Sequence, residues 1–179
     1  MKKKRFKPQA EQHQDFTIME ISTTMMDYML AFNLNKHLEI QLSKNDDLPV
    51  YLVHNNPVLY SLYFFCKDNL TEYYLIKNLA EQNQLMNSFL LIMRGQFIDS
   101  DVENIMNRTA NIEGVLYINP INLIDESSNK NKSNKTRKLV NTILTDLEYH
   151  MIGLKRKKDE TKIKLLQSKK KAIGKHYNS

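Results

Sequence analysis

The side chains best able to do chemistry in this sequence are lysines, and they gather at the two ends of the chain. Residues 1–10 carry a net charge of +5 and residues 130–179 carry +11, whereas residues 11–129 carry −10. Lysine is a flexible point charge that binds phosphate groups without reading base edges. The pattern predicts attachment to a polyanion through a basic set that comprises Lys2, Lys3, Lys4, Arg5, Lys155, Arg156, Lys157, Lys158, Lys169, Lys170 and Lys171.

The polyanion that these ends favour is RNA or a ribonucleoprotein, bound without sequence specificity. Beyond residue 130 the only aromatic side chains are Tyr149 and Tyr177, which are too few to form a stacking platform for bases. Charge runs of this kind also occur as solvated tails without a partner, and that alternative stays open.

A second feature that could bind a partner is an apolar stripe in residues 136–158, which have the periodicity of an amphipathic helix. The stripe consists of Val140, Ile143, Leu144, Leu147, Met151 and Leu154. An apolar stripe of this kind must pack against the chain's own core, another copy of the chain, a different protein or a membrane surface. The alternative function is therefore a protein–protein adaptor or a self-associating module, in which the basic end of one copy lies on the acidic part of another. The membrane surface is the weakest of these hypotheses, because the stripe contains no Trp or Phe.

The sequence contains few of the motifs that catalysis or cofactor binding requires. There are only four glycines, and none precedes Gly95, so the first 94 residues contain no P-loop and no dinucleotide fingerprint. The five histidines are scattered, and none has metal-ligand spacing to another His or Cys, so no metal site is expected. Because no nucleophile is paired with a base, we expect a non-enzymatic protein without a cofactor.

The strongest polar cluster outside the ends of the chain lies near the C-terminal end of the first predicted helix and consists of Asn33, Asn35, Lys36 and His37. Basic side chains at the C-terminal end of a helix interact favourably with its dipole. A small anionic ligand at this point is the alternative interpretation.

Compartment signals favour the cytoplasm. Cys66 is the one cysteine and lies in the apolar run SLYFFCKDN, which fits a reducing environment without disulfides. The charged start MKKKRFKPQAEQHQD is followed by no apolar segment, so a secretion signal is not expected. The longest apolar run, FLLIM, is far shorter than the ~20 residues that cross a bilayer.

The elements that must position these features indicate an α+β fold. Strand-like runs occur at 14–21, 61–67, 72–78, 88–95 and 115–119, with shorter ones at 39–42 and 50–54. The runs at 61–67 and 72–78 flank the turn DNLT and predict a hairpin, and the continuously apolar run at 88–95 predicts a central strand. Strands joined mostly by hairpins favour a mainly antiparallel sheet with two core helices, plus the C-terminal amphipathic basic helix.

The first core helix is predicted over residues 22–38. Met26, Leu30, Leu34 and Leu38 recur every four residues, and Met25, Met29 and Phe32 widen this stripe. Thr24 with Asp27 predicts a capping box at its start, as does Ser100 with Glu103 for the second helix at 101–112.

Composition divides the chain into four parts. These are a basic N-terminal tail (1–13), an acidic α+β core domain (14–124), a polar linker DESSNKNKSNK (125–135) and a basic helical C-terminal extension (136–179).

Taken in order, FTIMEI, MDYMLAFNLNKHL, EYYLIKN, SFLLIMRG and GVLYINP resemble a small bacterial family named for an I-P-E-x-x-V-D-Y motif. The best local match is DYMLAFNLNKHL, where Asp27, Tyr28, Leu30, Asn35 and Leu38 fall as in the family's early helix. The resemblance covers residues 16–123 approximately. It implies a compact α+β domain and transfers no catalytic residue.

Overall fold

The computed structural model of the chain describes residues 16–52, 56–68, 70–78, 86–122, 137–156 and 159–161. They form two compact units. Unit 1 comprises Met1–Asp47 and Leu59–Ser128, and unit 2 comprises Leu48–Val58 and Asn129–Ser179. Residues 48–58, which lie within the core domain expected from composition, are thus grouped with the C-terminal segment.

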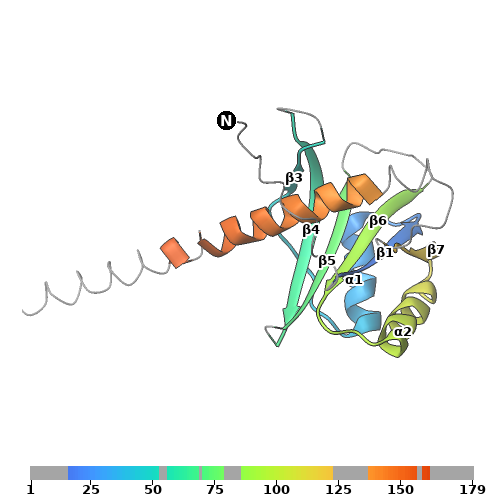
Figure 1. Cartoon of the computed structure of the whole chain (residues 1–179). Coiled ribbons are helices and arrows are strands. Elements are labelled where there is room, and N and C mark those ends of the chain that lie inside the picture. Colours follow the sequence, from blue (N-terminus) through green and yellow to red (C-terminus); the bar gives the residue numbers. More distant parts are fainter. Residues whose placement is uncertain are drawn as a thin grey trace, which may run out of the picture. The chain divides into compact units, whose positions relative to one another are not determined.

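Unit 1 is built on an antiparallel sheet, so the predicted α+β class is confirmed (Figure 1). Its strands are β1 (Phe16–Thr23), β2 (Ser43–Lys44), β4 (Val58–Lys67), β5 (Thr71–Asn78), β6 (Asn87–Arg94) and β7 (Val115–Pro120). They lie in the order β2-β4-β5-β6-β1-β7. The predicted central strand is confirmed, because β6 pairs with β5 on one side and with β1 on the other.

The predicted hairpin is also confirmed, because β4 and β5 pair antiparallel around the turn at Asp68. Asp68 has the left-handed φ of 54°, a conformation that aspartate tolerates in turns. Aromatic pairs hold the two strands together: the rings of Phe64 and Tyr74 are 5.0 Å apart, and those of Phe65 and Tyr73 are 6.2 Å apart. Such cross-strand pairs stabilise the sheet.

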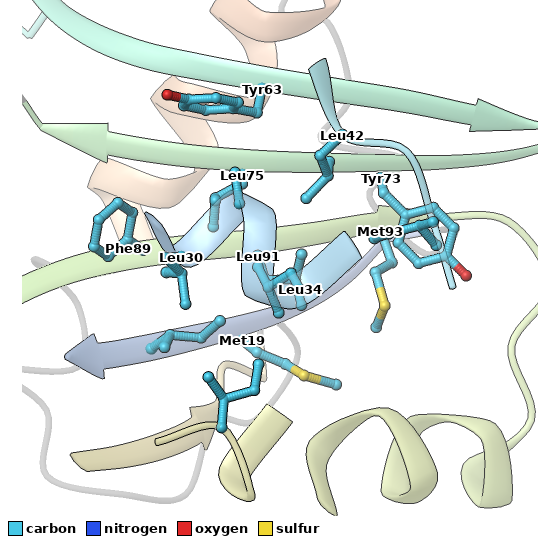
Figure 2. Packing of buried hydrophobic residues seen from close by; sticks show 14 of the residues in the cluster. Met19, Leu30, Leu34, Leu42, Tyr63, Tyr73, Leu75, Phe89, Leu91 and Met93 are labelled. Atoms are coloured by element: carbon cyan, nitrogen blue, oxygen red, sulfur yellow. The ribbon is translucent and has the colours of Figure 1, made fainter. Parts of the chain in front are cut away.

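Two helices, α1 (Asp27–Leu38) and α2 (Asp99–Ala110), pack on one face of this sheet. Figure 2 shows Leu30 and Leu34 of α1 next to Met19, Leu91 and Phe89, whose side chains come from the strands. α2 adds partly buried side chains, Val102, Ile105 and Met106, to the same cluster. This cluster is the core that fixes where α1 and α2 lie.

The buried stripe of α1 is narrower than predicted. Leu30, Ala31 and Leu34 are buried, whereas Met26, Met29 and Phe32 are exposed. Successive residues of a helix are rotated by about 100°, so Phe32 lies on the face opposite Leu30 and Leu34. The prediction that Met29 and Phe32 widen the buried stripe is therefore wrong.

Both predicted capping boxes are wrong as well. Thr24 does not cap α1, because β1 runs to Thr23 and the backbone N–H of Thr24 donates to the carbonyl of Gly114 (3.1 Å). Ser100 lies inside α2, which begins at Asp99. There the carboxylate of Asp101 accepts from the backbone N–H of Ile98 (3.4 Å), so one backbone donor is met from within the first turn.

Unit 2 contains β3 (Leu48–Val50) and the C-terminal helix, residues 137–156 and 159–161, which is orange in Figure 1. The helix predicted at 136–158 is confirmed over the residues that the structure describes. The strand expected at 50–54 is wrong over the residues described, because β3 begins at Leu48 and ends at Val50, and residues 51 and 52 are not in a strand. The run at 39–42 precedes a strand at 43–44 instead of forming one. Within unit 2 the backbone N–H of Tyr51 donates to the Asp146 carboxylate (2.9 Å), which joins this segment to the helix.

Candidate functional site

The C-terminal helix carries the described part of both predicted binding features. Lys155 and Arg156 are exposed in the C-terminal half of this helix. The other predicted nucleic-acid contacts lie outside the described residues; they are Lys2, Lys3, Lys4, Arg5, Lys157, Lys158, Lys169, Lys170 and Lys171.

The predicted apolar stripe of this helix is buried within the single chain. Val140, Ile143, Leu144, Leu147 and Met151 are buried, and Leu154 is half-buried. The solvent-exposed side of the helix instead presents Lys138, Asn141, Thr145 and Tyr149. The six stripe residues therefore lie together on one face, as predicted, but five of them are not on the surface of the isolated chain.

In unit 1, a polar cluster connects the start of α1 to the sheet. The hydroxyl of Tyr63 on β4 donates to the carboxylate of Asp27. Burial raises the pKa of Tyr63 to about 12, and the negative charges of Asp27 and Asp47 contribute in the same direction. The Nζ of Lys44 lies 5.4 Å from the centre of the Tyr63 ring and pairs with Asp47.

This cluster positions α1 and offers little acid–base chemistry at neutral pH. A tyrosine with a pKa of about 12 stays protonated there, so it serves as a hydrogen-bond donor and is a poor general base. Asp27, which the family resemblance places in the early helix, is its acceptor.

A second polar network lies on the opposite face of the sheet. The hydroxyl of Tyr74 donates to Glu72 (2.6 Å), and Glu72 pairs with Arg94 at 3.6 Å. Arg94 also lies over the ring of Phe16, at 5.5 Å from its centre. Burial, followed by the hydrogen bond to Glu72, holds the pKa of Tyr74 well above its usual range. The network joins β5, β6 and β1, and it satisfies a buried hydroxyl.

In the predicted polar cluster at the end of α1, the asparagine side chains form hydrogen bonds to the chain's own backbone. The Asn35 side chain accepts from the backbone N–H of Leu42 (2.7 Å) and donates to the Leu42 carbonyl (3.0 Å). The Asn33 amide donates to the carbonyl of Met29 (2.9 Å). Both asparagines thus hold the backbone, which leaves Lys36 as the exposed polar group of this cluster on α1.

Sequence reasoning missed both tyrosine–carboxylate pairs. Tyr63 and Asp27 are 36 positions apart on a strand and a helix, so no local pattern relates them. The contact between Glu72 and Tyr74 could have been predicted from their spacing, because residues two apart on a strand lie on the same face of the sheet.

No cation site or membrane-spanning element was found in the described residues. Among them, no group of three or more His, Cys, Asp or Glu side chains could hold a metal ion. A search of the same residues found no helix with the length and apolar character needed to cross a bilayer.

Comparison of the chain with known proteins found no relative. No family model matches the chain, and neither the curated proteins nor the solved structures contain a match. The resemblance to the I-P-E-x-x-V-D-Y family stays a prediction.

Proposed function

We propose that this protein is a cytoplasmic, non-enzymatic binding protein that attaches to RNA or a ribonucleoprotein through its lysine-rich ends. The observation that carries the proposal is the division of charge, +5 and +11 at the ends against −10 between them. A polyanion is attracted to the ends and repelled by the middle part, so we expect the ends to make the contacts.

The C-terminal helix supports the basic residues as the contact surface. Lys155 and Arg156 are exposed in the C-terminal half of the helix, whereas most of the apolar stripe is buried. Lysine and arginine in this position contact phosphate oxygens, which fix position and orientation without base specificity.

Nuclease treatment separates the two classes of partner. The native protein is purified from its own cells with and without nuclease, and the co-purifying material is compared. Loss of the associated material after nuclease supports attachment to nucleic acid. An association that survives nuclease contradicts the proposal and points to the protein–protein adaptor.

Salt dependence with matched variants tests which lysines make the contacts. We expect Lys170→Gln/Lys171→Gln to lower the slope of log K against log salt by about 1.4 on single-stranded RNA, since each phosphate contact contributes roughly 0.7. The control, Lys36→Gln/Lys67→Gln, removes the same charge from exposed positions of unit 1 and should leave the slope unchanged. Equal effects of the two variants would show that only net charge matters and would contradict binding through the ends.

A further inference from the structure

The outer face of α1 is apolar, which is unusual for a helix at a protein surface. Tyr28 is 63% exposed, Met29 43% and Phe32 70%, and Met26 just before the helix is 55% exposed. On a helical wheel Tyr28 and Met29 lie on either side of Phe32, and Lys36 is an exposed charge on the same face of α1. Surface helices normally place charged and polar residues on this side, and contiguous exposed apolar patches commonly mark interaction sites.

The helix cannot bury this face by rotating, because its inner side is tied down at both ends. Leu30 and Leu34 are 0% exposed in the core of unit 1. The Asp27–Tyr63 hydrogen bond holds the first turn, and the side chain of Asn35 is bonded to the backbone of Leu42. At the C-terminal end, Glu39 pairs with Arg108 of α2 at 2.8 Å. The apolar face is therefore held towards solvent.

We propose that this face packs against α1 of a second copy of the chain, in antiparallel orientation across a two-fold axis. The two ends of α1 differ in charge: Asp27 lies at the start, with Asp47 close enough to act on the same tyrosine, and Lys36 and His37 lie in the last turn. Antiparallel pairing sets the acidic end of each helix beside the basic end of the other. With the axis near residue 30, Tyr28 of each copy faces Phe32 of the other copy, so the surface is complementary to itself.

The size of the face predicts a weak dimer. Aromatic side chains bury about 150–250 Å² each, so the exposed fractions of these four side chains correspond to roughly 400 Å² of apolar surface per copy. A standard stable interface takes about 800 Å² per partner. The pairing therefore falls at the low end of specific interfaces, with a dissociation constant on the order of micromolar.

Sedimentation of the full chain tests the proposal. The protein is treated with nuclease, so that shared nucleic acid cannot join copies, and measured from about 1 to about 300 µM. We expect a concentration-dependent monomer–dimer equilibrium. Phe32→Ser should raise the dissociation constant by about tenfold or more. Ile98→Ser, at a side chain of similar exposure (67%) just before α2, should leave it unchanged.

Two results would overturn the proposal: a wild-type chain that stays monomeric over the whole range, or a Phe32→Ser variant that dimerises like the wild type. Thermal melts of both variants show whether the fold is retained, and because both positions are exposed, we expect no loss of structure.

Cysteine crosslinking tests the orientation. In a Cys66→Ser background, Met29→Cys lies near the axis and should form a disulfide-linked dimer on oxidation. Lys36→Cys should not, because antiparallel pairing places the two cysteines about 18 Å apart along the axis. A crosslink at position 36 but not at 29 would exclude the antiparallel arrangement.

Discussion

The two helices of unit 1 have the same length and pack on the same face of the sheet, yet they expose different kinds of side chain to solvent. α1 buries Leu30, Ala31 and Leu34, whereas Thr109 is the one buried residue of α2. Outside, α2 exposes Asp99, Asp101 and Glu103, while α1 exposes mainly apolar side chains. The difference shows that α2 is an ordinary solvated helix, whereas α1 has one apolar face in the core and a second apolar face exposed to solvent.

Their first turns differ as well. Each begins near an aspartate that lies close to a tyrosine of the sheet, Asp27 near Tyr63 and Asp101 near Tyr73. Asp27 accepts a hydrogen bond from its tyrosine, while Asp101 acts on Tyr73 through its charge. α1 is thus attached to the sheet by a directional contact in addition to its apolar side chains.

The largest expected effect is on the core contact of α1. Leu34→Ala should destabilise the protein by about 2–5 kcal/mol, because it removes a fully buried side chain and leaves a cavity. Met106→Ala on α2 should cost less, about 1–2 kcal/mol, since Met106 is only partly buried. Urea unfolding of the full chain measures both.

Phe32→Ala is the control for this comparison. Its side chain is exposed, so at low micromolar protein concentration the free energy of unfolding should change by no more than about 0.5 kcal/mol. Equal losses for Leu34→Ala and Met106→Ala would show that the two helices contribute alike to the core.

The next effect concerns alkaline pH. The pKa of Tyr63 is about 12 in the folded chain, against an ordinary value of 10.0, so the folded state keeps a proton that the unfolded state loses. This contribution to stability is fully present below pH 10 and is lost as the pH rises from 10 to 12. The wild type should therefore exceed Tyr63→Phe by about 1–2 kcal/mol at pH 9, and the difference should shrink towards pH 12.

Denaturant unfolding at several pH values measures this difference, and Tyr73→Phe sharpens the comparison with α2. The pH-dependent part of the Tyr73→Phe effect should be smaller, because the pKa of Tyr73 is raised mainly by burial and then by the charge of Asp101, without a hydrogen bond to a carboxylate. A wild-type advantage over Tyr63→Phe that stays constant from pH 9 to 12 would contradict the assigned role of the Tyr63 proton.

The smallest expected effect is on the ion pair that links the two helices. Arg108→Ala removes the 2.8 Å contact to Glu39, whose side chain is largely exposed, so the free energy of unfolding should fall by no more than about 1 kcal/mol. Added salt should reduce the difference from the wild type, because exposed charges are screened. A loss of more than about 2 kcal/mol that does not respond to salt would show that Arg108 supports the packing of α1 against α2 through its aliphatic part.

Much of the fold could be predicted because it follows from local patterns. The β4–β5 hairpin, the central strand β6 and the helix at 137–156 each have a periodicity or turn signal within a short window. The helix starts could not be predicted in the same way. Thr24 has the residue type of a cap, but β1 extends to Thr23 and its pairing with β7 uses the backbone that a cap would need.

For the candidate sites too, some features follow from the sequence alone and others depend on tertiary packing. Charge segregation between the ends and the middle is a property of composition, so the sequence alone determined it, together with the fold class and the amphipathic character of the C-terminal helix. The tertiary structure decided which of the apolar side chains are free. Periodicity assigned Phe32 to the core and left the cover of Val140 open between the chain's own core and a partner, whereas packing exposes Phe32 and buries Val140. A hydrophobic side chain has the same identity in either place, and only the competition among all apolar faces for a limited interior settles where it lies.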